Sequence, residues 1–456
     1  MTLRKNSRLH DLLGPTGVLF LTDAAEAIER LLPHVEIDSW VESSWQLPEA
    51  TFTSIRRTEV RIIFSIGKKG DHWAKSLTTI MRRRSVSGFP ASMARTIAGR
   101  ERDICHQIAE RVSKVLSQKP NVLGSASLDA IRATFEESVI AAHLRQHHNF
   151  GLSVASMLDS FHKLAGQTYE NRALAFGCLV QDSNGATSTG VDFLRPLLDS
   201  KKYKAMSDGF RTAYVLTSTG TLTDFIDLNR NSDNKSHGAH FFPEWAEPMS
   251  RATQSGAIGV ALSRQGDVLI FESGTLRFTY RFGRWQYWNH AHLLNLLRNR
   301  ARAQKVKPTQ IGKVVGAVYK AALDVSFRRS GALFVILKNR KNLHKIVRHG
   351  DAFDDHGRME IDRRFDEIFS GKTIQNLPRA LVVELASVDG AIVIDNSGRL
   401  RAYGAVLEPK RRGHSRGMEG ARTKAAKGAS YFGLAIKVSS DGDISVFHDG
   451  EEFIKV

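Results

Sequence analysis

The spacing of apolar residues changes along this chain of 456 residues. The apolar run TGVLFLTD, residues 16–23, predicts a buried strand, and TEVRIIFSIG, residues 58–67, predicts a second one. From about residue 91 to residue 165, apolar side chains recur at helical spacing, as in ARTIAGRERDICHQIAERVSKVL. We therefore predict an α/β to helical N-terminal region over residues 1–165.

Strand patterns dominate the middle of the chain, residues 166–291. The segment RALAFGCLVQD begins them, and GAIGVALSRQGDVLIFESGTLRFTYRFGRWQYW ends them as a meander. The expected turns of this meander fall at Gln265-Gly266 and Ser273-Gly274. The pattern predicts a β-rich middle region.

Helical and strand patterns alternate in the last part of the chain, residues 292–456. A helical stripe over residues 311–325 precedes the apolar strand GALFVILKN, and AIVIDNSGRLRAYGAVL predicts a hairpin that turns at NSGR. A final hairpin is expected to turn at Asp441-Gly442, whereas LPRALVVELASV fits either a helix or a strand. The predicted fold class is α/β: a mixed β-sheet flanked by helices, preceded by α+β N-terminal and β-rich middle regions.

The charge balance narrows the class of partner. Lys and Arg number 65 and Asp and Glu number 47, so the formal net charge is +18. An excess of this size favours polyanions, including nucleotides and nucleic acid, without choosing among them. No stretch approaches the roughly 20 apolar residues of a membrane span, and the two cysteines lack metal-ligand spacing. We expect a cytoplasmic protein without a membrane segment.

One candidate for chemistry is Asp389-Gly390-Ala391, which opens the apolar run AIVI. A carboxylate at the mouth of a strand, followed by glycine, can hold a divalent cation beside a closely approaching ligand. The Asp-Gly pair is also typical of an ordinary tight turn. Both interpretations stay open on these residues alone.

A second candidate is EGARTKAAKGAS, residues 419–430. A helix that starts near Gly420 places Arg422, Thr423 and Lys424 in its first turn, where free N–H groups and the helix dipole favour anions. Cations at this end of a helix are otherwise unfavourable, which hints at a bound anion. A solvated basic helix also fits the segment.

Taken together, the elements of about residues 311–456 resemble the diadenylate cyclase domain, the ATP-condensing module shared with the DNA integrity scanning protein. The family has an Asp-Gly-Ala at the start of a strand, a Leu-Pro element after the hairpin partner of that strand, and a Gly-Thr-Arg-His-Arg helix start. A Gly-x-Ser and a VSEE-G-I-V hairpin complete the pattern. The matching positions here, in the same order, are Asp389-Gly390-Ala391, Leu407 with Pro409 apart from one inserted residue, Gly420 with Arg422 and Ala425-Ala426, Gly428 with Ser430, and VSSDGDISV.

The resemblance implies a reaction. Two ATP molecules, each held by one domain of a head-to-head homodimer, react so that each 3′-hydroxyl attacks the α-phosphate of the other, which gives cyclic di-AMP and pyrophosphate. Such phosphoryl transfer depends mostly on positioning and charge neutralisation. The implied roles are catalysis for Asp389, Arg422 and Lys424, binding of Mg²⁺ or Mn²⁺ for Asp389 and Asp441, and nucleotide contacts for Gly390, Ala391, Leu407, Gly420, Ala421, Thr423 and Ser430.

Several positions depart from the family pattern. Thr423 stands at the histidine, Lys424 at the second arginine, Ala421 at the threonine and Ser440 at the first glutamate of the hairpin. Lysine keeps the charge of arginine but loses its bidentate fork. A sensor that binds nucleotide without condensing it is therefore an alternative function.

Two further interpretations concern the rest of the chain. The basic segments MRRRS, residues 81–85, and RNRARAQKVK, residues 298–307, are candidates for nucleic-acid binding. The second segment lies at a predicted domain junction and is better interpreted as a solvated connector. The position of residues 1–291 ahead of a cyclase-like domain resembles bacterial proteins with an N-terminal sensor region. We expect such a region to control whether two C-terminal domains can pair.

Overall fold

The computed structural model describes the backbone of the strands at residues 35–43, 51–56, 59–69 and 72–83. It describes residues 153–181, 199–230, 241–303, 310–353, 371–409 and 419–456 with the side chains of all but residues 291, 292 and 303. It also describes part of residues 19–32, 103–112, 130–148 and 364–369. Among these residues, every helix is too short or too polar to cross a membrane.

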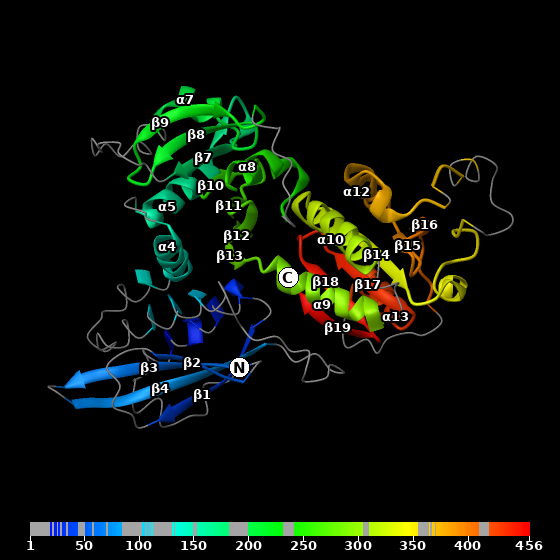
Figure 1. Cartoon of the computed structure of the whole chain (residues 1–456), viewed down its shortest axis with the longest axis horizontal. Coiled ribbons are helices and arrows are strands. Elements are labelled where there is room, and N and C mark those ends of the chain that lie inside the picture. The colour runs from blue at the N-terminus through cyan, green and yellow to red at the C-terminus, as the bar shows by residue number, and fades with distance from the viewer. Residues whose placement is uncertain are drawn as a thin grey trace. The chain divides into compact units, whose positions relative to one another are not determined.

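The chain forms two compact units (Figure 1). Unit 1 comprises Met1–His240 and Pro248–Trp288, and unit 2 comprises Phe241–Glu247 and Asn289–Val456. The chain therefore enters unit 2 for a short segment, returns to unit 1, and enters unit 2 again. These units divide the chain differently from the three predicted regions, because the first region and most of the second share unit 1.

The first described residues of unit 1 are helical where the sequence predicted a strand. The strand predicted at residues 16–23 is wrong: residues 19–20 and 22–24 are helical. Phe20, Ala24 and Leu31 are all buried, and their spacing puts them on one side of a helix. The described residues of the apolar run are therefore helical, like the described residues that follow them.

Two sheets follow in unit 1. The first is antiparallel in the order β1-β4-β3-β2, and its strand β3 confirms the prediction at residues 58–67. The second has the order β13-β12-β11-β10-β7-β8-β9, in which only the β7–β8 pair is parallel. The strands are β1 (Val35–Ser43), β2 (Thr51–Arg56), β3 (Glu59–Lys69), β4 (His72–Arg83), β7 (Phe176–Gln181), β8 (Thr212–Thr217), β9 (Leu222–Asp227), β10 (Ile258–Leu262), β11 (Val268–Glu272), β12 (Thr275–Arg281) and β13 (Arg284–Tyr287), with a small ribbon of β5 (Thr168–Tyr169) and β6 (Arg172–Ala173).

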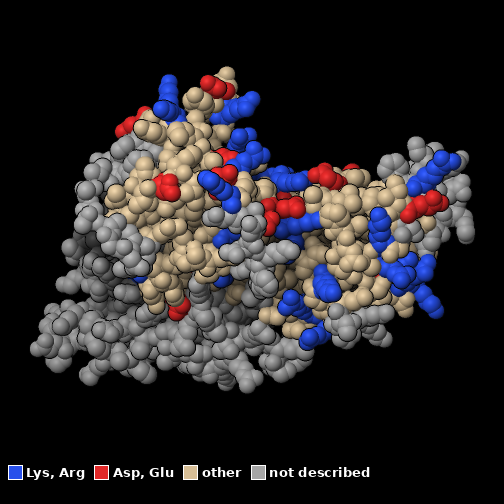
Figure 2. Space-filling view, turned by 45° about the horizontal axis from the view of Figure 1, so that its top comes forward, with Lys and Arg blue, Asp and Glu red and all other residues tan. Residues whose placement is uncertain are grey.

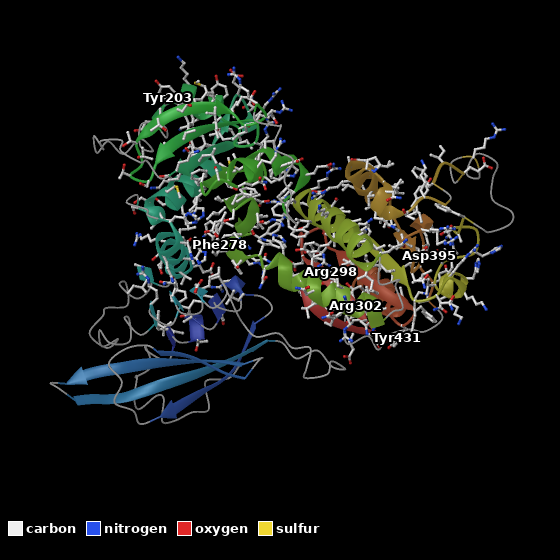
Figure 3. The ribbon with its side chains drawn as sticks, viewed as in Figure 1. Tyr203, Phe278, Arg298, Arg302, Asp395 and Tyr431 are labelled. Carbon is white, nitrogen blue, oxygen red and sulfur yellow. The ribbon has the colours of Figure 1, made fainter. Side chains whose placement is uncertain are left out.

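Helices cover the larger sheet of unit 1. Phe161 of the helix α5 packs in one apolar core with Phe278 and Trp285 of the sheet, and Figure 3 labels Phe278. Turns between β10, β11 and β12 confirm the predicted meander. The helices described in full are α4 (Phe135–His147), α5 (Val154–Ala165), α7 (Lys201–Met206) and α8 (Glu247–Ala252), which follows the 3₁₀ turn η3 (Glu244–Ala246).

Unit 2 contains the predicted mixed sheet, in the order β16-β15-β14-β17-β18-β19. β14 and β15 are parallel and every other pair is antiparallel. Both predicted hairpins are confirmed, and β19 adds a strand that the sequence analysis did not predict. The strands are β14 (Ala332–Leu337), β15 (Ala391–Ile394), β16 (Leu400–Ala405), β17 (Gly433–Val438), β18 (Ile444–His448) and β19 (Glu451–Lys455).

Helices cover both faces of this sheet, as the sequence predicted. Ala426 and Ala429 of α13 pack against Leu333 and Val335 of β14, and α10 and α12 contact the sheet from the other face. The ambiguous segment LPRALVVELASV is helical, because Val382, Val383, Leu385 and Ala386 form one buried stripe. The helices are α9 (His290–Ala303), α10 (Ile311–Phe327), α12 (Arg379–Ser387) and α13 (Ala421–Ser430), with 3₁₀ turns η4 (Arg340–Lys345) and η5 (Ile374–Asn376).

A short segment of unit 2, Phe241–Glu247, is fixed to α10 and α12; we call it the strap. Asp324 of α10 accepts a hydrogen bond from the backbone N–H of Glu244 at 2.7 Å. Arg379 of α12 donates to both carboxylate oxygens of Asp324, at 2.5 and 2.7 Å, and to the carbonyl of Phe242 at 2.7 Å. Burial raises the pKa of Asp324, although Arg379 and Glu244 oppose the shift. The strap and the start of α12 therefore share one buried polar network.

Candidate functional site

The candidate site lies at one edge of the sheet in unit 2. β14 and β15 run parallel, so the residues before both strands lie at the same edge. Val438, the last residue of β17, pairs with Ala332, the first residue of β14, so the turn after β17 lies at this edge too. Asp389, Gly331 and Asp441 thus all lie along it.

Asp389 is held between a helix and a strand. α12 ends at Ser387, and the chain turns into β15 through Gly390, whose φ is +121°. A Cβ on Gly390 would lie 2.7 Å from the backbone nitrogen of Ala405, so only glycine fits this turn. The Asp389 side chain projects fully into solvent, with a relative exposure of 102%. This geometry presents a carboxylate at the sheet edge.

Arg422, in the first turn of α13, points to the same place. Its Nη2 lies 3.7 Å from Oδ1 of Asp389. The guanidinium also lies against Gly331, since a Cβ there would be 2.8 Å from Cζ of Arg422. Two of the three residues that the sequence analysis placed in catalysis, Asp389 and Arg422, are therefore brought together across the start of β14.

The first turn of α13 is electropositive. Gly420 is the N-cap and makes no side-chain capping bond, and the first turn contains no acidic residue. Helix dipoles place partial positive charge at this end, so the side chains of Arg422 and Lys424 add to it. Lys427 pairs with Glu419 just ahead of the helix, which fixes the approach of the chain to Gly420. An anion is the expected ligand of this turn.

Thr423 has a partner that the sequence analysis missed. Nζ of Lys437, on β17, donates a hydrogen bond to Oγ1 of Thr423 at 3.1 Å. The sequence contains one hint of this contact. Lys437 is the single charged residue of the otherwise apolar strand GLAIKV, whose other residues are all buried in the structure. A third cation therefore lies at the first turn of α13.

Leu407 lies near the same edge, because Ala405 pairs with Ala391 at the start of β15. It forms a bridge with Val347 and packs, partly buried, against the core beneath α13. This position suits an apolar wall beside the charged groups. Gly390 and Ala391 shape the turn at Asp389, and Gly420 and Ala421 begin α13.

Two predicted site residues, Ser430 and Asp441, do not lie beside Asp389 and Arg422. Ser430 is the last residue of α13, at the opposite end from Arg422, and it is fully buried. Its hydroxyl donates to the carbonyl of Lys427 at 2.7 Å and accepts from the N–H of Gly450 at 2.8 Å. The hydroxyl is therefore used within the fold, and we leave Ser430 out of the site.

Asp441 lies at the correct edge but follows β17, whereas Asp389 precedes β15. Two strand spacings, about 10 Å, separate β15 from β17. Asp441 therefore lies two strands away from Asp389, and its role as a metal ligand stays a prediction. Among the described residues, no group of three or more His, Cys, Asp and Glu side chains is arranged to hold a metal ion. A single exposed carboxylate does fit Mg²⁺, which is commonly bound by one or two carboxylates together with substrate phosphates.

A protein-family model matches the part of the chain that contains this site. Residues 319–452 match the family model described as DAC, DisA bacterial checkpoint controller nucleotide-binding. The C-terminal part of the chain is therefore a DAC domain, as its motifs predicted. No curated protein matches the chain significantly.

Two solved structures are similar to part of the chain. One is a double cysteine mutant of DacA from Staphylococcus aureus, 22% identical, with a TM-score of 0.22, covering 32% of this chain and 87% of that chain. The other is described as a hypothetical membrane spanning protein from Bacillus cereus, 16% identical, with a TM-score of 0.23, covering 36% of this chain and 98% of that chain.

Proposed function

We propose that this protein is a diadenylate cyclase, which condenses two ATP molecules into cyclic di-AMP and two molecules of pyrophosphate. The observation that carries the proposal is the approach of Asp389 and Arg422 to 3.7 Å at the first turn of α13, within a DAC domain. A carboxylate beside a cationic helix start can serve a metal and a triphosphate at once.

Each of these residues has a separate role in the proposed reaction. The N–H groups of the first turn of α13, with Arg422 and Lys424, bind the phosphates and neutralise the charge that moves to the leaving pyrophosphate. A 3′-hydroxyl oxygen forms a bond to the α-phosphorus of the second ATP while the bond to pyrophosphate breaks. Asp389 orients the attacking hydroxyl and favours loss of its proton. Mg²⁺ or Mn²⁺, bound by Asp389 and the phosphates, would supply further positive charge at the reacting oxygens.

The reaction needs two such sites face to face, and the surface around Asp389 is suited to this. The neighbouring apolar side chains Val388 and Val406 are 47% and 42% exposed. Exposed apolar groups beside a reactive carboxylate favour contact with another molecule. We propose that a second DAC domain, in a head-to-head homodimer, covers this surface during the reaction.

We also propose that unit 1 regulates the site through the strap. The strap bonds to Arg379 at the start of α12, and the end of α12 leads directly to Val388 and Asp389. Both ends of the strap continue into unit 1. A change in unit 1 that pulls on the strap would therefore act on the helix that positions Asp389. A cytoplasmic location, with access to ATP, is part of the same proposal.

The alternative is a nucleotide sensor, which Thr423 and Lys424 favour because they replace a histidine and an arginine of the family pattern. A nucleic-acid-binding role has less support. Figure 2 shows Lys and Arg side chains spread over the visible face with Asp and Glu side chains among them, instead of a single basic stripe.

One experiment separates these functions. The full-length protein is incubated with ATP and Mn²⁺ or Mg²⁺, and the products are identified by mass spectrometry. We expect cyclic di-AMP from the wild type, none from Asp389→Asn, and wild-type amounts from Asp159→Asn, an exposed carboxylate of unit 1. Tight ATP binding without product would support the sensor instead.

A further inference from the structure

We propose that Lys437 is a phosphate-binding residue of this site, and that Thr423 holds its ammonium group at the first turn of α13. The inference rests on the proposed function, since it names a further residue that binds the triphosphate. It starts from one contact, the hydrogen bond of 3.1 Å from Nζ of Lys437 to Oγ1 of Thr423.

The strand β17 places Lys437 beneath α13. Lys437 pairs with Leu333 of β14 and with Ser445 of β18, so it lies in the interior of the sheet. Its side chain is on the same face as Ala435, because residues two apart on a strand share a face. Ala435 belongs to the core that α13 covers. A half-buried lysine here contrasts with the fully buried residues around it in β17.

No counter-ion explains this lysine. Within the described residues, the cations Arg422, Lys424 and Lys437 make a single ion pair, the one between Arg422 and Asp389. The first turn of α13 contributes no acidic side chain. Three cations near the positive end of a helix repel one another and the dipole. A polyanion bound among them would offset this repulsion.

The Lys437–Thr423 pair also accounts for the threonine. An ammonium group has three donors and no acceptor, so a bond to Thr423 fixes one donor and leaves two for phosphate oxygens. A neutral hydroxyl can accept this bond, whereas a protonated histidine at residue 423 would repel it. In this chain the positive charge beside residue 423 therefore comes from Lys437 of the strand β17, instead of from a side chain of α13 at residue 423.

The test is a set of binding measurements by calorimetry on the full-length protein, with ATP, inorganic tripolyphosphate and adenosine as ligands. Loss of one charge-assisted hydrogen bond corresponds to roughly 10- to 150-fold weaker binding. We expect Lys437→Met to weaken ATP and tripolyphosphate to that extent and to leave adenosine unchanged. Lys437→Arg keeps the charge and should restore most of the affinity. Lys338→Met removes an exposed lysine at the opposite edge of the sheet and should bind like the wild type.

A second comparison tests the role of Thr423. Thr423→Val keeps the shape and removes the acceptor, so we expect weaker tripolyphosphate binding in this single variant. Added to Lys437→Met, the same change should cause no further loss, because the ammonium group that Thr423 holds is already gone. Additive losses in the double variant would overturn the positioning role. Thermal unfolding of each variant shows whether the fold is kept.

The outcomes separate the two proposals. If the wild type binds ATP and makes cyclic di-AMP while folded Lys437→Met binds tripolyphosphate equally well, the inference about Lys437 is wrong and the cyclase proposal stands. Equal weakening of adenosine and tripolyphosphate would point to a structural role and overturn it as well. If the wild type binds neither ATP nor tripolyphosphate, the proposed function fails and this inference fails with it.

Discussion

Replacing Gly331 by alanine should separate the stability of the DAC domain from its activity. Gly331 lies just before β14, and its φ is outside the left-handed region, so the backbone accepts alanine. The added methyl group meets the guanidinium of Arg422, with Cζ at 2.8 Å. Because the obstacle is the tip of a long side chain that is 38% exposed, Arg422 can rotate away instead of forcing the strand to move.

The expected magnitudes differ between the two properties. Moving an exposed side chain costs little, so the free energy of unfolding should change by no more than about 0.5 kcal/mol. Displacing Arg422 would remove the charge-assisted hydrogen bond to phosphate that we propose for it, and such a bond contributes about 1.5–3 kcal/mol. That loss corresponds to a fall of roughly 10- to 150-fold in kcat/KM for cyclic di-AMP synthesis.

The assay combines chemical denaturation with initial rates of cyclic di-AMP formation. The matched control is Gly316→Ala, inside α10, where an added Cβ meets no atom within 4 Å. This control should stabilise the protein by about 0.5–1 kcal/mol and keep wild-type rates. Wild-type kcat/KM in folded Gly331→Ala would refute the assignment of Arg422 to the site. Unfolding of that variant would refute the expectation that Arg422 rotates away from the new methyl group.

Three further predictions concern the framework of the site. Gly390→Ala should lower the free energy of unfolding by at least about 1–3 kcal/mol, measured by urea denaturation, because its φ of +121° and the backbone at Ala405 exclude a side chain. Arg379→Met should cost about 3–5 kcal/mol in the same assay, because Asp324 is left as a buried, unpaired carboxylate; a loss below 1 kcal/mol would contradict the buried network. Burial alone would raise the pKa of Asp395, labelled in Figure 3, but hydrogen bonds from Ser397 and Arg401 hold the pKa below its usual value. That carboxylate therefore stabilises the fold above about pH 4, and the stability is lost as the pH falls through its folded pKa. Thermal unfolding of Asp395→Asn should show a deficit at pH 7 that narrows at pH 3, and an equal deficit at both would refute the sign.

Local patterns were enough to predict most elements of unit 2. The turn at Asp395–Arg399 and the turn at Asp441-Gly442 carry Gly at positive φ, at Gly398 and Gly442, and both hairpins follow from that chemistry. The run at residues 16–23 misled the prediction because a short apolar run fits a strand and a buried helix equally. Only the burial of Ala24 and Leu31 on the same side decides for the helix.

The site was predictable as far as its residues lie within continuous motifs. Asp389 and Arg422 each stand in a recognisable local context, and the parallel pairing of β14 and β15 brings them to one edge. Ser430 lies at the far end of α13 from Arg422, and sequence spacing along the helix does not reveal which of its ends faces the ligand. The contact of Lys437 with Thr423 depends on the pairing of β17 with β14, which no local pattern encodes.

The strap and Asp389 are both connected to the helix α12. Asp389 is exposed and makes its one ion pair, within the described residues, at 3.7 Å, so its position is set by the backbone on either side rather than by side-chain contacts. On one side that backbone is Gly390, locked by the approach of β16, and on the other it is α12. α12 is in turn fixed at its first residue by Arg379, which bonds to Asp324 and to the strap. Since a misplacement of about 1 Å in a phosphoryl-transfer site can cost two orders of magnitude in rate, the bonds of the strap are well placed to set the activity of Asp389 without contacting nucleotide. Under the proposed function, a regulatory input and a catalytic carboxylate would thus be joined by a single short helix.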